Sequence, residues 1–438
     1  MVIRLKKTMK VKKSCIIYLI VASSIAILNI VAWNSTAFCD AYIKYIFPIW
    51  VNTYGRFMNL FSFSVGEIML FLGVGLAVLF VLMLPVAAVV KIVDLIRMGK
   101  ERQAVASEVF IHQEQMQKAA GAVQTDPTQV RELVEPRRDG EEGKRMSGFS
   151  IRRLGKGYMT FFMWLLLVVC LIMTLHCTIL YHASTFSEKY FGESKTEYTL
   201  EDLVAVRNLV VEECNALSAQ MNRDDQGWII YDKDVRRVAV ETMQQLGETY
   251  DQLDGYYPYP KPLATSDFFS QQYMCGYYFP FSMEANYNDV MYIMNKPSTL
   301  CHELAHLRGY IFEDEANFIS YLACIQSDDP VVQYSGYLSV LNYLDNDYYK
   351  SVGRNWEIYS TQPGILQQVH DDNIFLTQEE WDRIEDKAVL DTELVEEVSD
   401  AFTETALKAN GVSDGMLSYS RVVKLLLQYY EREGLLDQ

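Results

Sequence analysis

Three long apolar runs without a charged side chain constrain this 438-residue chain more than any other feature. They cover residues 15–33, 68–90 and 158–181, and none of them contains Lys, Arg, Asp or Glu. Each run has the length that a hydrocarbon core of roughly 30 Å demands of a helix. Helices buried inside soluble proteins rarely continue so far without a charge. The sequence therefore predicts three membrane-spanning helices within the first 181 residues.

Basic residues set the expected orientation of these helices. Six Lys or Arg precede residue 15 and thirteen lie in residues 91–156, whereas residues 34–67 contain only two. Because cytoplasmic loops carry the excess of basic residues, we expect the N-terminus and residues 91–157 in the cytoplasm. The chain from about residue 184 onward then lies outside the cell. The first run also has the basic lead-in of a secretory signal, but its long apolar stretch favours an uncleaved anchor.

Charge separates the two parts of the chain. Residues 184–438 contain 18 basic and 44 acidic residues, a net charge of −26, within a whole chain of −17. Such an acidic domain argues against a nucleic-acid partner, which requires clustered positive charge. The expected organisation is two spans with a short outer loop in 1–90, a cytoplasmic charged linker in 91–157, the third span, and an outer domain in 184–438.

The outer domain carries signals for helices and for a small sheet. Residues 256–295 are dense in Tyr, Phe, Pro and Gly and contain two pieces that favour strands, GYYFPF at 276–281 and DVMYIMN at 289–295. A Glu-Ala-Asn at 284–286 is expected in a loop that could line a cleft. Apolar periodicity and capping residues predict helices elsewhere, at Thr199–Met221, Asp234–Leu253, Lys296–Gly309, Glu313–Gln326, from Thr377 onward and at 418–430. The fold class is therefore α+β: three N-terminal transmembrane helices and a mostly helical outer domain with a small sheet.

One stretch, STLCHELAHLRGYIFEDEANFISYLAC at 298–324, carries the chemistry. His302 and His306 are four residues apart on a predicted helix, so both imidazoles lie on one face. Their nitrogens can converge on one Zn²⁺ at about 2.1 Å. Glu303 flanks that face and can reach a water on the metal. The sequence predicts a zinc site here.

The third ligand is expected on the following helix. Small or polar side chains share one of its faces, namely Glu313, Ala316, Asn317, Ser320 and Cys324, and Glu315 lies with the bulky apolar ones. The small face can approach the zinc helix closely. Glu313 is therefore the predicted third ligand, with Glu315 as the fallback, and Asn317 could hold the second nitrogen of a histidine. Cys324 is about 16 Å away along the axis, too far to share the metal.

Three protein ligands leave a fourth position for water, which is typical of catalytic zinc. Glu303 would then act as the general base in the hydrolysis of a peptide bond. The alternative is a zinc-binding but non-hydrolytic ectodomain of a membrane sensor or assembly factor. The presence of Glu303 favours the enzyme, because a binding site has no use for a base there. The predicted strand at 289–295 could pair with an extended peptide or protein substrate.

The motif H-E-x-x-H followed by E-x-x-A-[DN], here Glu313 to Asn317, resembles that of the glutamate-ligand zincins. Three longer stretches, GYYFPFSMEANYND, CHELAHLRGYIFEDEANFISYLAC and SYSRVVKLLLQYY, resemble the bacterial membrane-protein family catalogued as domain of unknown function 3810. The resemblance implies a zinc-dependent peptidase anchored in the bacterial cell membrane. By the same match, Tyr419 and Arg421 are candidates for donors to the oxyanion, with Tyr337 behind them.

Overall fold

The chain divides into two units, each described here by itself. The computed structural model describes residues 13–122, 145–192, 198–388, 392–393, 395 and 421–436. One unit comprises the chain up to Leu70 together with Val169 onward, and the other comprises Phe71–Val168. The first unit therefore contains residues 184–438, called the outer domain after its predicted placement, the whole first apolar run and the adjoining ends of the other two.

Three helices are long and apolar enough to cross a membrane, which confirms that prediction at the level of length and composition. They are α1 (Lys13–Asn34), the apolar part of α5 (Val65–Ala122), and a span at Gly157–His182. This last span begins in α6 (Arg145–Met173) and continues through two irregular turns, η2 (Thr174–Thr178) and η3 (Leu180–His182).

The predicted cytoplasmic linker is helical wherever the structure describes it. Helix α5 does not end at Val90 but continues to Ala122, and α6 already begins at Arg145. Residues 91–122 are rich in Lys, Glu, Gln, Ala and Met, which are strong helix formers, so the helix continues after the apolar run stops. Residues 123–144, with most of the predicted EPRRDGEEGKRMSG linker, lie outside the described residues.

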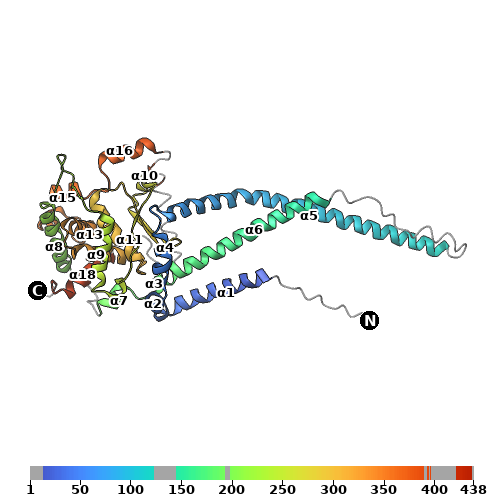
Figure 1. Ribbon diagram of the computed structural model, residues 1–438, viewed down its shortest axis with the longest axis horizontal. Coiled ribbons are helices and arrows are strands. Elements are labelled where there is room, and N and C mark those ends of the chain that lie inside the picture. Colours follow the sequence, from blue (N-terminus) through green and yellow to red (C-terminus); the bar gives the residue numbers. More distant parts are fainter. Residues whose placement is uncertain are drawn as a thin grey trace. The chain divides into compact units, whose positions relative to one another are not determined.

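The predicted short outer loop between the first two spans is a set of short helices that belongs to the outer domain. They are α2 (Thr36–Tyr45), α3 (Phe47–Trp50), η1 (Val51–Gly55) and α4 (Arg56–Met58). Ile43, Phe47 and Val51 are buried in the same core as the outer domain. Figure 1 shows α2, α3 and α4 at the side of the domain from which α1 leaves.

The outer domain is mostly helical with a three-stranded sheet, so the expected α+β class holds. Its helices are α7 (Phe186–Tyr190), α8 (Leu200–Ser218), α9 (Val235–Gly247), α10 (Ser266–Ser270), α11 (Lys296–His306), α12 (Glu313–Ile325), α13 (Pro330–Ser351), α14 (Trp356–Tyr359), α15 (Gln367–Asp372), α16 (Gln378–Lys387) and α18 (Arg421–Arg432), with 3₁₀ turns η4 (Asp251–Leu253) and η5 (Ile293–Asn295). Its strands are β1 (Lys261–Pro262), β2 (Gly276–Phe279) and β3 (Glu284–Tyr287).

Helix starts follow the capping residues that the sequence offers. Thr199 closes a capping box with Asp202 at the start of α8, Asp234 caps α9, and Thr377 caps α16. These three predicted starts are confirmed, because each side chain accepts a hydrogen bond from an otherwise unsatisfied backbone N–H. Helix α9 ends at Gly247, before the predicted Leu253.

The sheet has the order β1-β3-β2, with β1 parallel and β2 antiparallel to the central β3. The predicted strand in GYYFPF is confirmed as β2. Two other expectations are wrong: residues 284–286 are the central strand and not a loop, and 289–295 form a turn and η5 and not a strand. The backbone N–H of Tyr292 donates to Phe375 O at 2.9 Å, so this apolar piece is buried under a distant loop instead of in the sheet.

Helix α11 lies at the centre of the domain. It contacts the helices α9, α12 and α13, and it also contacts the strands β2 and β3. Leu300 and Leu304 are fully buried, and the facing side chains of α12, Ala316 and Ile319, are equally inaccessible. This packing fixes the helix that carries both histidines.

Candidate metal centre

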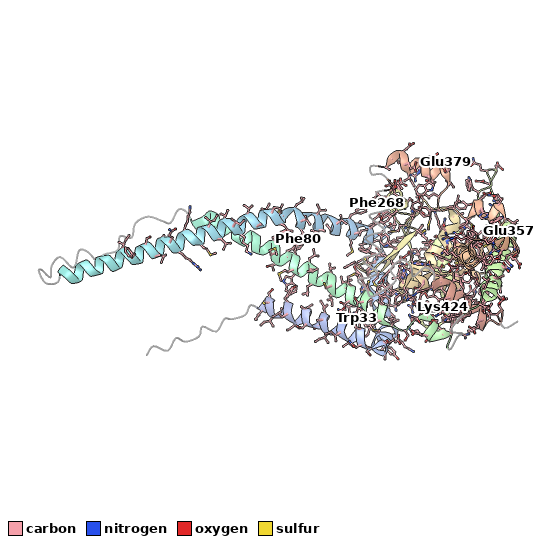
Figure 2. The ribbon with its side chains drawn as sticks, turned by 180° about the vertical axis from the view of Figure 1, so that it is seen from behind. Trp33, Phe80, Phe268, Glu357, Glu379 and Lys424 are labelled. Atoms are coloured by element: carbon pink, nitrogen blue, oxygen red, sulfur yellow. The ribbon has the colours of Figure 1, made fainter. Side chains whose placement is uncertain are left out.

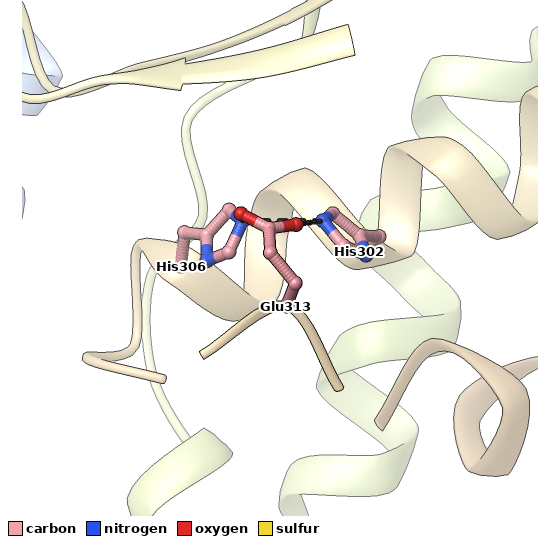
Figure 3. Close-up of side chains that lie close together, drawn as sticks. All are labelled: His302, His306 and Glu313. Carbon is pink, nitrogen blue, oxygen red and sulfur yellow. Dashed lines mark hydrogen bonds and ion pairs between the residues drawn. The ribbon is translucent and has the colours of Figure 1, made fainter. Parts of the chain in front are cut away.

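His302, His306 and Glu313 converge at the junction of α11 and α12 (Figure 3). The Nε2 atoms of the two histidines lie 3.1 Å apart. Glu313 Oε2 is 3.1 Å from His302 Nε2, and its Oε1 is 3.9 Å from His306 Nε2. Gly309, with φ +92°, occupies the turn between the helices. This left-handed conformation lets the chain reverse so that Glu313 faces the histidines.

The second nitrogen of each imidazole is held by an oxygen. His302 Nδ1–H donates to Asn317 Oδ1 at 2.8 Å, and His306 Nδ1–H donates to Tyr310 O at 2.6 Å. Because amide and peptide carbonyl oxygens only accept, both protons reside on Nδ1. Both Nε2 atoms then face each other beside a carboxylate, an arrangement that a shared proton or a shared cation stabilises.

The donor set fits a tetrahedral zinc ion. Imidazole nitrogen and carboxylate oxygen bind zinc at about 2.0 to 2.2 Å, so two ligands of one tetrahedral ion lie about 3.4 Å apart. The three observed separations of 3.1, 3.1 and 3.9 Å lie on either side of that value. Two histidines and one glutamate are also a donor set of catalytic zinc sites.

Charge within the cluster favours an anionic Glu313. Burial raises the pKa of Glu313, but the hydrogen bond from His302 Nε2–H and the charge of His302 outweigh burial and lower it. Burial likewise lowers the pKa of His302, and Glu313 more than reverses this. Burial lowers the pKa of His306 to about 4, so this imidazole stays neutral. Glu313 and His306 are in the protonation states that metal ligands require, and His302 would release its Nε2 proton when a cation binds.

Glu303 lies beside the cluster with an unused oxygen. Its side chain is buried, and Oε2 has no hydrogen-bond partner among the described residues. The backbone N–H of Tyr278 donates to the carboxylate. Burial, reinforced by the charge of Glu313, raises the pKa of Glu303 to about 8 against the opposing charge of His302. A Cβ on Gly276 would lie 2.9 Å from Glu303 Oε1, so strand β2 can pass this close only with a glycine there.

The cluster and Glu303 line one cleft of about 730 Å³. Strand β2 borders it with Gly276 and Tyr278, and helix α13 borders it with Ser339, Asn342 and Tyr343. Sequence reasoning did not single out α13. Its signal was present, because Asp329 and Pro330 form an N-cap followed by proline at the first helical position.

The other predicted site residues lie elsewhere. Glu315 accepts a hydrogen bond from the backbone N–H of Phe186 and is not part of the cluster. Tyr337 packs edge-on against Tyr321 at 5.7 Å and does not line the cleft. Arg421 does not line the cleft either. Its charge lowers the pKa of Asp314, but burial outweighs this effect and raises that pKa. Tyr419 lies outside the described residues.

Comparison with known proteins gives a family match. No curated protein and no solved structure matches the chain. The pattern of the family described as "Protein of unknown function (DUF3810)" matches residues 145–427, more than half of the chain. The matched range includes the third apolar helix, the cleft and the His302–His306–Glu313 cluster. The chain therefore belongs to the DUF3810 family.

Proposed function

We propose that this protein is a zinc-dependent peptidase anchored in the bacterial cell membrane, with its N-terminus in the cytoplasm and its catalytic domain outside the cell. One observation carries the proposal. Two imidazole Nε2 atoms face each other next to Glu313, and in the same cleft the buried carboxyl of Glu303 has an oxygen that no described residue hydrogen-bonds. A site that only bound a metal would gain nothing from burying an unpaired carboxyl beside it, since such burial is costly.

His302, His306 and Glu313 would hold the zinc ion. When bound, zinc supplies Lewis-acid chemistry, lowering the pKa of a water and polarising a peptide carbonyl. Asn317 and the carbonyl of Tyr310 keep both imidazoles oriented, because each accepts from an Nδ1–H. The protein thus supplies a fixed set of ligands before any substrate enters.

Glu303 is suited to carry a proton between water and the leaving amine. Its position is set by the Tyr278 N–H and by the close approach of Gly276, and Oε2 is left without a partner. A cation held by the cluster would favour the ionised form of Glu303, since a nearby positive charge lowers a carboxyl pKa. The carboxylate then takes the proton of the attacking water and delivers it to the amine nitrogen of the broken peptide bond.

Strand β2 supports binding of an extended chain. Within the described part of the chain it pairs with β3 on one side only, and its residues Gly276 to Tyr278 line the cleft. The free edge of a strand is a template for a further strand. We expected residues 289–295 to pair with a substrate in this way. Because they do not form a strand, we assign this role to β2.

The test compares the wild-type protein with Glu303→Gln, both full length in lipid nanodiscs. We expect both to retain one equivalent of zinc, and hydrolysis of a random peptide library to fall about 10²- to 10⁴-fold in the variant. Glu315→Gln is the matched control, because it keeps an acceptor for the Phe186 N–H and lies outside the cluster. It should retain both zinc and hydrolysis.

Three results would contradict the proposal or its choice of ligands. Equal hydrolysis by wild type and Glu303→Gln, or none by either with zinc bound, would favour a zinc-binding ectodomain of a sensor or assembly factor. Loss of zinc in Glu315→Ala but not in Glu313→Ala would overturn the choice of the third ligand.

A further inference from the structure

The wall of the cleft includes the end of a membrane-spanning helix. Tyr181 is the penultimate residue of the third span and lines the same cleft as the metal cluster. Its ring packs edge-on against that of Phe312 at 5.3 Å, and Phe312 directly precedes Glu313. The outer end of the span is therefore in contact with the start of the helix that supplies the third ligand.

A tryptophan marks the depth of this end of the span. The rings of Trp33 and His182 lie 4.3 Å apart, and Trp33 is 58% exposed at the outer end of α1. Tryptophan at the end of a span is enriched at the membrane–water boundary. Tyr181 lies next to His182 in the chain, so this wall of the cleft is at the depth of the lipid headgroups.

The segment between the first two spans, residues 36–64, exposes apolar side chains next to this boundary. Leu60 is 78% exposed and Tyr45 65% exposed, and Ile49, Phe57 and Phe63 are about half exposed. Both neighbours of this segment in the chain, α1 and α5, are candidate spans. Continuity with two spans and the aromatic character of the segment assign this apolar surface to the outer lipid boundary.

The same segment also packs against the turn between the two helices that carry the proposed metal ligands. Ile43 of α2 is buried, and its Cγ2 lies 3.1 Å from where a Cβ on Gly309 would be. Gly309 is in the turn that joins α11 to α12. One face of α2–α4 is therefore exposed beside the spans, and the other contacts the turn between the metal ligands.

Hydrogen bonds fix the domain to the ends of the spans. The Gly66 N–H at the start of α5 donates to Glu284 Oε2 at 2.6 Å, and Glu67 Oε1 accepts from the Thr265 N–H at 2.8 Å. His176 Nδ1–H in the third span donates to Pro280 O at 2.7 Å. A cleft on a flexible tether could act at any height above the bilayer. These hydrogen bonds instead hold the cleft of this protein at one fixed distance from the bilayer.

From this geometry we infer that the cleft takes the segment directly outside the membrane span of another membrane-anchored polypeptide. The inference rests on the proposed peptidase function and names its substrate class. An extended chain advances about 3.3 Å per residue, so a cleft at headgroup depth meets the first few residues that leave the bilayer. Residues farther along a tethered chain spend less time at that height.

The test uses full-length protein in liposomes and synthetic substrates of one design. Each substrate has a Leu/Ala helix of about 20 residues, a Gly/Ser spacer, and a randomised segment, with spacers of roughly 3, 10 and 30 residues. The free randomised segment is the soluble form. We expect the shortest spacer to be cut about tenfold or more faster than the longest, and the free form more slowly still. Glu303→Gln serves as the blank for every substrate.

The outcomes separate the two proposals. Equal rates at all spacers, or faster cleavage of the free form, would overturn the inference and leave the peptidase in place. If the zinc-loaded protein cleaved none of these substrates, the proposed peptidase function itself would be wrong.

Lipid contact gives a readout that does not depend on cleavage. Leu60 and Trp356 are each replaced by photoreactive benzoylphenylalanine. Both are highly exposed, but Trp356 adjoins Glu357, which Figure 2 shows on the side of the domain away from Trp33. Irradiation should cross-link position 60 and not position 356 to lipid. Equal cross-linking at the two positions would overturn the assignment of the apolar surface.

Discussion

The orientation of two imidazole rings decides what the centre can bind. His302 and His306 each have one nitrogen fixed by an oxygen acceptor, which leaves the other free toward Glu313. Helical spacing alone would allow either ring to turn away. The side chain of Asn317 and the carbonyl of Tyr310 thus contribute to the site without touching the metal position.

Replacing Asn317 by Ala should weaken zinc binding about 10- to 100-fold, because His302 loses the acceptor that orients it. Asn317→Asp keeps an acceptor and should bind zinc at least as tightly as the wild type. Competition with a chromogenic chelator measures the affinities. Asn342→Ala is the control, since Asn342 lines the same cleft and is hydrogen-bonded to Asn373 instead of a histidine. A similar loss in Asn342→Ala would contradict an orienting role for Asn317.

At the scale of the element, the small sheet links the cleft to the second span. Glu284 on β3 accepts from the Gly66 N–H and pairs with Lys261 on β1, and both charged side chains are almost fully buried. Lys261 Nζ also donates to Met58 O at 2.7 Å. Removing one partner of such a pair leaves a charge without compensation in the interior.

Lys261→Met should therefore destabilise the outer domain by about 3–5 kcal/mol. Arg236→Met is the control, because Arg236 pairs with Asp234 on the surface, where loss of the ion pair costs about 1 kcal/mol or less. Thermal or denaturant unfolding of the purified protein measures both. Equal and small shifts in the two variants would mean that the buried pair contributes little.

Local signals account for the elements that the sequence predicted well. Caps such as Thr199 and Thr377 act within one turn, and the face of α12 that carries Glu313 and Asn317 follows from helical geometry. The failures involve partners distant in the chain. Glu284 can be a buried strand residue because Lys261 and the Gly66 N–H bind its carboxylate. Tyr292 lies outside the sheet, where its backbone N–H donates to the carbonyl of Phe375. Neither partner can be identified from the local pattern.

At the scale of the whole molecule, the outer domain does not begin after the third span. Residues up to Leu70 belong to the same unit as Val169 onward, and Ile43, Phe47 and Val51 complete its core. The apolar runs correctly predicted three helices long and apolar enough to cross a membrane, since length and hydropathy are local properties. The core extends beyond the predicted domain of 184–438, because α2–α4 pack against segments more than a hundred residues away in the chain.

A fragment of residues 184–438 should consequently fail to form a stable domain. Without α2, the turn at Gly309 and the surrounding core lose their cover and expose apolar surface to water. Limited proteolysis and near-UV circular dichroism, compared with the full chain in nanodiscs, measure the difference. A fragment that resists protease as well as the full chain does would contradict this view of the domain.

Tyr181 in the wall of the cleft also bears on how the protein should be handled in the laboratory. A detergent micelle covers the apolar belt of a membrane protein and extends over its edges. With the placement inferred above, that edge is the rim of the cleft, and detergent would compete with any chain that enters it. Purification that begins in detergent should end in a lipid nanodisc before turnover is measured, and inhibitor screens run in micelles would favour amphiphilic compounds that act on the rim alone.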